Sequence, residues 1–134
     1  MKMIVTAVIA ALVTTTTITP VVARNLKEKV KVEIESVGLH PGMDPGMYVC
    51  ASGHLHIKGT VQNLADVPLR HVQVTGHAFD GDGKLLGTAT TTTKGDKVSP
   101  GAKAEINLEF LTVTGPAIQL VKRHEVTVVG APSL

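Results

Sequence analysis

The sequence predicts an all-β protein, an antiparallel β-sandwich of about seven strands preceded by a cleaved signal peptide. Three observations carry this prediction. Apolar and polar residues alternate along most of the chain after residue 23, and turn-forming Gly, Pro, Asn and Asp recur at spacings of roughly ten residues. Outside the N-terminal segment, no stretch has the spacing of an amphipathic helix. The 134 residues are enough for one domain with its own hydrophobic core.

The first 23 residues have the layout of a secretory signal peptide. A lysine gives a positive start, residues 4–13 form a mostly apolar run, and threonines follow. Val21 and Ala23 then stand where a signal peptidase reads small residues. A retained single-span anchor is the alternative, but a membrane span needs about 20 predominantly apolar residues. We therefore expect cleavage after Ala23, a single mature domain over residues 24–134, and a periplasmic or secreted location.

Alternation locates the strands of the mature chain. Each has apolar side chains on one face and polar side chains on the other, as a half-buried strand requires. Turns separate the strands, the clearest at Asp80-Gly81-Asp82-Gly83. The strands are expected at residues 27–35, 54–62, 71–78, 84–93, 103–110 and 120–129. Their inward-facing residues form the predicted core, which comprises Val30, Val32, Ile34, Leu55, Ile57, Val61, Val72, Val74, Ile106, Leu108, Phe110, Val126 and Val128.

Composition excludes some classes of function. The 13 Lys and Arg against 11 Asp and Glu leave a formal charge of +2, too small a basic excess for a nucleic-acid-binding surface. One Tyr, two Phe and no Trp cannot form a platform for stacking bases. The single cysteine, Cys50, cannot form an internal disulfide, so the fold must depend on its hydrophobic core. Cys50 can be a small buried residue, a metal ligand or a partner in an intermolecular disulfide.

The histidines suggest one geometry in particular. His54 and His56 lie two residues apart on an expected strand, so both point to the same face. We expect a hairpin between this strand and the next one, with Leu64 opposite Leu69. This pairing keeps the apolar residues of both strands on one face and places His56 directly across from His77. Three neutral imidazoles in such a triangle can bind Cu(II) or Zn(II).

The loop before these histidines adds His40, Met43, Met47 and Cys50. Thioether and thiolate groups are soft donors that suit Cu(I), so copper is the first candidate metal and zinc the second. Two alternatives remain open: the histidines can lie on an ordinary solvated face, or beneath another strand. Cys50 near His54 also leaves open a nucleophile–base pair, and hence a small hydrolase or redox protein. No other catalytic arrangement stands out in the sequence.

Several turn and core motifs together resemble the FxLYD family of bacterial immunoglobulin-like domains. They are Gly59-Thr60-Val61-Gln62-Asn63, the pair Val72 and Val74, the stretch from Phe79 through Asp80-Gly81-Asp82-Gly83-Lys84 to Thr88, and Ser99-Pro100-Gly101. The resemblance covers roughly residues 55–110, about half of the mature chain. The family's Phe-Tyr-Asp motif is Ala78-Phe79-Asp80 here, so one aromatic residue is missing. The resemblance implies an immunoglobulin-like sandwich that is exported or surface-attached and has no shared catalytic residues.

We therefore expect an exported, non-catalytic β-sandwich that acts as a binding or structural module of the cell envelope and needs no cofactor. Its expected partner is another envelope or extracellular protein, with no nucleic acid and no membrane span after signal cleavage. The alternative function is a periplasmic or extracellular protein that binds copper or zinc. That site would use His54, His56 and His77, with Met43, Met47 or Cys50.

Overall fold

The computed structural model describes residues 24–35 and 46–134. The predicted signal peptide, and the loop residues His40 and Met43, lie outside the described residues. Within them, seven strands alternate with turns and two short helical segments. The strands are β1 (Val30–Ile34), β2 (Met47–Val49), β3 (His54–Asn63), β4 (Gln73–Phe79), β5 (Leu85–Thr92), β6 (Lys103–Thr114) and β7 (Arg123–Gly130). The helical segments are the 3-10 turn η1 (Lys27–Lys29) and the short helix α1 (Pro116–Leu120).

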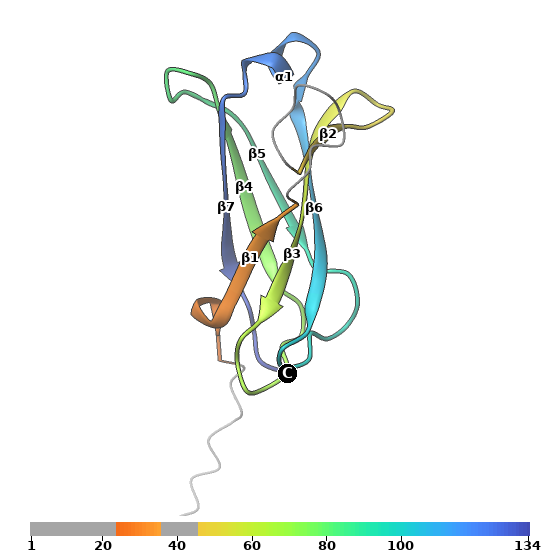
Figure 1. The fold of residues 1–134 in the computed structure, drawn as a ribbon, viewed down its shortest axis with the longest axis vertical. Coiled ribbons are helices and arrows are strands. Elements are labelled where there is room, and N and C mark those ends of the chain that lie inside the picture. Colours follow the sequence, from red (N-terminus) through yellow and green to blue (C-terminus); the bar gives the residue numbers. More distant parts are fainter. Residues whose placement is uncertain (1–23, 36–45) are drawn as a thin grey trace, which may run out of the picture.

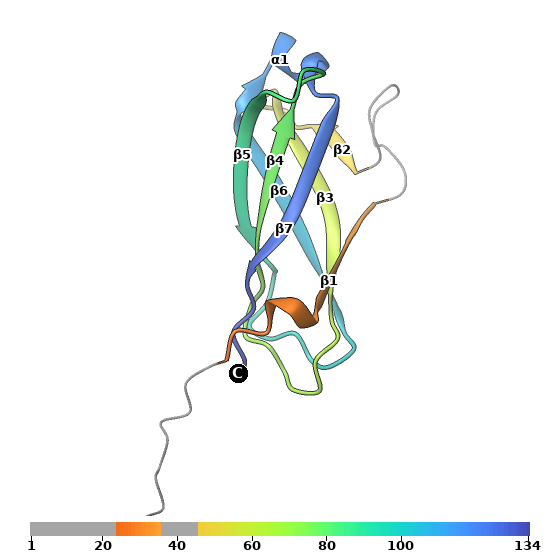
Figure 2. The same ribbon diagram turned by 90° about the vertical axis from the view of Figure 1, so that its left-hand side faces the viewer.

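The strands form two antiparallel sheets that pack face to face (Figure 1). In the first sheet, β3 pairs with β6 on one side and with both β1 and β2 on the other. The second sheet has the order β5-β4-β7. Figure 2 shows the second sheet in front, with α1 at one end of the elongated sandwich and the C-terminus at the other. The predicted all-β antiparallel sandwich is confirmed. No helix of the described residues is long and apolar enough to cross a membrane.

The outer edge of the first sheet consists of two separate strands. β1 pairs with residues 59–63 of β3, and β2 pairs with residues 55–57. At Lys58, between these segments, the backbone N–H donates to the Gly46 carbonyl oxygen at 2.8 Å. The Lys58 carbonyl accepts from the Glu35 N–H at 3.2 Å. The hydrogen-bond ladder therefore runs without a break along this side of β3 and fixes β2 in register beside it.

Residues that face inward from both sheets form one hydrophobic core. The predicted core residues of β3, β4 and β6, together with Val72 just before β4, are buried, namely Leu55, Ile57, Val61, Val72, Val74, Ile106, Leu108 and Phe110. The five predicted core residues on β1 and β7 are partly buried and pack against that core, namely Val30, Val32, Ile34, Val126 and Val128. Two further core residues, Leu69 and Val98, lie in the connections between strands, where alternation does not reveal them. The predicted inward phase of the strands is therefore right.

Several strand limits differ from the prediction: β2 (Met47–Val49) was not expected as a strand, and β6 continues to Thr114 instead of ending at residue 110. Residues 27–29 form a 3-10 turn instead of the start of a strand, and the Lys29 N–H donates to the Leu26 carbonyl at 2.8 Å. The last strand begins at Arg123 instead of Leu120, because Pro116 starts a short helix that ends at Leu120. Proline suits the first turn of a helix, since its missing N–H has no partner to lose there.

The predicted hairpin between residues 54–63 and the following strand is wrong. β3 and β4 belong to different sheets, so Leu64 does not lie opposite Leu69 as a hairpin pair. Leu69 is fully buried and forms an isolated bridge with Val98. Alternation identifies the residues that face inward, but two strands with the same phase can either share a sheet or face each other across the core. Here they face each other.

Asn63 begins the crossing from the first sheet to the second. Its side chain is fully buried, and its Nδ2 donates to the carbonyl oxygens of Val67 at 2.9 Å and Val98 at 3.0 Å. Its Oδ1 accepts from the Ala65 N–H at 2.8 Å. Three hydrogen bonds from one buried amide hold the chain in a turn that leads away from β3.

Candidate metal-binding site

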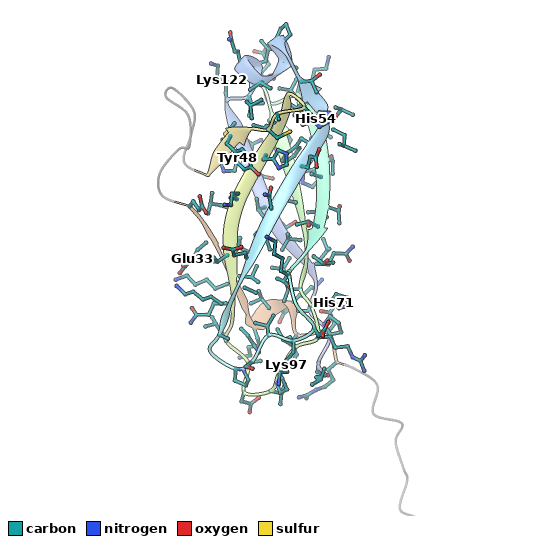
Figure 3. The ribbon with its side chains drawn as sticks, turned by 90° about the vertical axis from the view of Figure 1, so that its right-hand side faces the viewer. Glu33, Tyr48, His54, His71, Lys97 and Lys122 are labelled. Atoms are coloured by element: carbon teal, nitrogen blue, oxygen red, sulfur yellow. The ribbon has the colours of Figure 1, made fainter. Side chains whose placement is uncertain are left out.

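A cluster of polar side chains surrounds His56 on the outer face of the first sheet. His56 lies on β3 directly between Tyr48 of β2 and Glu109 of β6, since it pairs with both residues across the strands. Its ring stacks on that of Tyr48, with ring centroids 4.7 Å apart and planes inclined by 23°. Although it points away from the core, His56 is only 8% exposed. The cluster lies toward the α1 end of the sandwich, where Figure 3 shows Tyr48 and His54.

One nitrogen of the His56 ring is held by two neighbouring side chains. Nδ1 lies 2.7 Å from Oδ1 of Asn107 and 3.2 Å from the Tyr48 hydroxyl. The Asn107 Nδ2 donates to that same hydroxyl at 2.7 Å. An amide oxygen can only accept, so the contact with Asn107 requires a hydrogen on Nδ1. A hydrogen on Nδ1 leaves the lone pair of the neutral His56 ring on Nε2.

The other ring nitrogen has no hydrogen-bond partner among the described residues. His56 Nε2 is buried and unpaired. A ring nitrogen of His56, the Cys50 Sγ and a carboxylate oxygen of Glu109 all lie within 4.8 Å of one another. Because Nδ1 is engaged by Asn107 and Tyr48, Nε2 is the nitrogen free to bind. Ligand atoms around a tetrahedral zinc ion lie about 3.3 to 3.8 Å apart, so three donors within 4.8 Å of one another are close to the spacing that one ion requires.

A tight turn places Cys50 beside this cluster. The Gly53 N–H donates to the Cys50 carbonyl at 2.9 Å, and the Cys50 N–H donates to the His54 carbonyl at 3.1 Å. Gly53 has φ 81°, a left-handed conformation that glycine adopts without the strain of a side chain. Strand alternation then turns Cys50 to the same face as Tyr48, and so toward His56 instead of the core.

Glu109 also contacts a second histidine. His54 Nδ1 lies 2.8 Å from Oε1 of Glu109, and the side chains are 25% and 44% exposed. This contact holds the carboxylate near the α1 end of β3. His54 itself is not within the group of three donors.

The structure does not assemble the predicted histidine triangle. His77 lies on β4 in the second sheet and faces outward there, stacked on Phe79 with ring centroids 6.2 Å apart. His56 and His77 therefore lie on opposite outer faces of the sandwich. Met47 is 2% exposed and belongs to the hydrophobic core, on the other face of its strand from Tyr48. Of the six predicted donors, the structure brings Cys50 and His56 together and places His54 next to them.

Sequence reasoning missed three members of the cluster, namely Tyr48, Asn107 and Glu109. The alternation of residues 103–110 does place Asn107 and Glu109 on the polar face of their strand. Nothing in the sequence pairs that strand with β3, which is about 50 residues away, and the pairing alone brings Glu109 to His56.

The order Cys50, His56 and Asn107 is also that of the thiol, imidazole and amide groups in cysteine proteases. The position of Glu109 distinguishes a nucleophilic cysteine from a metal-binding cysteine. A carboxylate within 4.8 Å of the sulfur repels a thiolate anion, which a nucleophilic cysteine must form. A cation between the two groups instead stabilises both anions. The arrangement therefore suits metal binding better than nucleophilic catalysis.

In the part of the chain that the structure describes, a second buried side-chain nitrogen also lacks a partner, Nδ1 of His124 on β7. Among the described residues, His124 belongs to no group of three or more potential metal ligands. An unpaired nitrogen alone does not make a site, and the feature specific to His56 is the thiol and carboxylate beside it.

In comparisons with known proteins, no family model, no curated protein and no solved structure matches this chain.

Proposed function

We propose that this chain is an exported, non-catalytic β-sandwich whose function is to bind a transition-metal ion, zinc first. The observation that carries the proposal is that His56, whose buried Nε2 has no partner among the described residues, has a ring nitrogen within 4.8 Å of the Cys50 thiol and the Glu109 carboxylate. Leaving a buried polar group unpaired costs free energy, typically about 1–3 kcal/mol. A bound cation would remove that cost and would stabilise a thiolate and a carboxylate together.

The donor set favours zinc over other metals. Thiolate, imidazole and carboxylate are the three ligand types that Zn(II) takes in proteins. Calcium and magnesium prefer oxygen ligands alone, and only one of these donors is an oxygen. The copper interpretation rested partly on thioether sulfur, but Met47 is buried in the core. Copper remains the second candidate, because thiolate and imidazole also suit Cu(I).

Export and the finer fold type belong to the same proposal. The N-terminal pattern ending at Ala23 supports export. The connections β3–β4, β5–β6 and β6–β7 each join one sheet to the other, and β4–β5 is a hairpin within one sheet. Such crossings are typical of Greek-key sandwiches and support an immunoglobulin-like domain related to the FxLYD family.

A metal-free binding module is the second candidate function. The outer face of the second sheet favours it, because partly exposed His77 and Phe79 and exposed Arg123 gather there. The Arg123 guanidinium lies 4.2 Å from the centre of the Phe79 ring, and His77 stacks on the same ring. Aromatic and Arg side chains are enriched at protein interfaces, so this face suits a protein partner of the envelope.

A zinc titration of the purified, reduced chain tests the proposal. We expect one equivalent of zinc to bind, and Cys50→Ser, His56→Gln and Glu109→Gln each to weaken binding at least tenfold. His77→Gln is the matched control, because it removes an outward imidazole from the opposite sheet and should leave affinity unchanged. Cobalt(II) in place of zinc should give a thiolate charge-transfer absorption that Cys50→Ser abolishes.

Two outcomes contradict the proposal. One is that the unchanged chain binds neither zinc nor copper. The other is that His56→Gln and Cys50→Ser, both shown by circular dichroism to be folded, bind as tightly as the unchanged chain. Rapid modification of Cys50 by an alkylating agent, lost in His56→Gln, would instead favour the nucleophile–base interpretation.

A further inference from the structure

We infer that Asn107 and Tyr48 are positioning residues that hold His56 in its Nδ1–H tautomer and so reserve Nε2 for the metal ion. This inference rests on the proposed metal-binding function and names the residues that prepare the site. Neither residue contributes a donor to the group of three, and both act through the ring of His56.

The geometry supplies three restraints on one imidazole ring. The Asn107 Oδ1 accepts from Nδ1–H at 2.7 Å, and the Tyr48 hydroxyl lies 3.2 Å from the same nitrogen. The Tyr48 ring stacks on the imidazole. A flip of the His56 ring about its Cβ–Cγ bond would break both polar contacts, and a smaller rotation would also disturb the stacking. The ring orientation is therefore set before any ion arrives.

The two positioning residues also hold each other. Asn107 Nδ2 donates to the Tyr48 hydroxyl at 2.7 Å, which orients the amide with its oxygen toward His56. Tyr48 comes from β2 and Asn107 from β6, the strands on either side of β3. The contact therefore spans three strands and closes over the imidazole, which explains why an outward-facing histidine is 8% exposed.

This arrangement has a direct consequence for metal affinity. A neutral histidine that carries its hydrogen on Nε2 must move that hydrogen before Nε2 can bind an ion. Holding the hydrogen on Nδ1 removes this step and raises the basicity of the ligand nitrogen. Loss of such a partner of a metal-binding histidine typically costs about 10- to 100-fold in metal affinity.

Three variants test the inference on the full chain. Asn107→Leu removes the acceptor, Asn107→Asp keeps an acceptor at the same position, and Tyr48→Phe keeps the stacked ring without the hydroxyl. Glu105→Leu is the matched control, since Glu105 points outward on the same strand, opposite Thr60 and away from the cluster. Nitrogen-15 NMR of the metal-free chain reports which ring nitrogen of His56 carries the hydrogen, and competition with a chelator reports zinc affinity.

We expect Nδ1–H in the unchanged chain, a mixture of tautomers in Asn107→Leu, and Nδ1–H again in Asn107→Asp. Zinc affinity should fall about 10- to 100-fold in Asn107→Leu and recover in Asn107→Asp. Tyr48→Phe should lose less than Asn107→Leu, and Glu105→Leu should not change. A merely structural role for Asn107 would alter unfolding temperature without altering the tautomer.

The outcomes separate this inference from the proposed function. If the unchanged chain binds zinc but Asn107→Leu binds it equally well, the positioning role is wrong and the metal site stands. An Nε2–H tautomer in the unchanged chain also overturns the inference, because the Asn107 amide would then be donating to Nδ1. If the unchanged chain binds no metal, the proposed function fails, and the positioning role fails with it.

Discussion

His54 Nδ1 lies 2.8 Å from a carboxylate oxygen of Glu109, so the carboxylate across from His56 is shared with a second imidazole on the same strand. His54 and His56 both point outward from β3, but only His56 is shielded by Tyr48 and Asn107. In the proposed metal site the two histidines would have different roles: His56 would supply a ligand nitrogen, and His54 would orient the Glu109 carboxylate.

Replacing His54 should weaken zinc binding less than replacing Glu109 does. In His54→Gln the carboxylate remains a ligand but loses the contact that orients it, whereas Glu109→Gln removes the anionic donor. Chelator competition on the two variants measures the difference. An equal loss of zinc affinity in both variants would mean that His54 is itself a ligand. A loss of the same size in His77→Gln would mean that the metal site lies elsewhere.

Leu108→Ala should destabilise the fold strongly. Leu108 is fully buried on β6, and removing most of its side chain leaves a cavity that costs about 2–5 kcal/mol. Thr91→Ala on β5 should change the free energy of unfolding by no more than about 0.5 kcal/mol, because Thr91 is only partly buried. Urea unfolding of the two variants checks both values. A small effect at Leu108 would contradict the packing of β6 against the second sheet.

Gly59→Ala should be among the most damaging single substitutions. A Cβ at Gly59 would collide with the backbone carbonyl oxygen of Glu33, and it would meet the Ile34 Cα at 3.2 Å. Backbone of a paired strand cannot move aside cheaply, so we expect a loss of at least about 1–3 kcal/mol. Gly81→Ala is the control, because the Cβ there meets only the Lys122 side chain at 3.7 Å. Similar unfolding midpoints for the two variants would show that β1 does not pair with β3 as described.

Lys103→Met should raise the pKa of Glu33 toward its ordinary value of 4.5. Hydrogen bonds from Lys103 first, and from Lys31 second, lower the pKa of this carboxyl in the folded chain. Each lysine nitrogen lies 3.1 Å from a Glu33 oxygen. A lowered pKa in the folded state stabilises the fold above pH 4.5, and the stabilisation is lost as the pH falls through the lowered pKa.

Carbon-13 NMR titration of the Glu33 carboxyl measures this pKa. Lys97→Met is the control, because Lys97 is not among the groups that lower the pKa of Glu33. An unchanged midpoint in Lys103→Met would mean that the contact between β6 and β1 is absent in solution. The pair is largely exposed, so its effect on stability should shrink further in high salt.

Exported protein should begin at Arg24. Arg24 is held beside the C-terminal segment, since the Arg24 carbonyl accepts from the Ser133 N–H at 2.9 Å and the Arg24 N–H donates to the Ser133 hydroxyl at 3.0 Å. Intact-mass analysis of the exported chain measures the N-terminus. Ala23→Leu should retain the precursor, because a signal peptidase requires a small residue there. A mature mass that still includes residues 1–23 would contradict the prediction.

Local pattern in the sequence was sufficient for the class of fold. Period-two alternation identified Leu55, Ile57 and Leu108 as inward-facing, because a strand turns successive side chains to opposite faces wherever it lies. The turn at residues 80–83 was also predictable, since Asp80 Oδ1 accepts from the N–H groups of Asp82 and Lys84, and Gly83 adopts φ 81°. Both features depend only on residues close together in the chain.

Which strands pair was not predictable in this way. His54, His56 and Cys50 could be recognised as donors, but the assignment of His77 to the same face depended on a hairpin that the fold does not form. Only the tertiary structure places Tyr48, Asn107 and Glu109 around His56 and leaves Met47 in the core. The physical reason is that alternation sets the face of each side chain and says nothing of its neighbours across the sheet. Those neighbours are decided by how the whole core packs, through contacts between residues far apart in the chain.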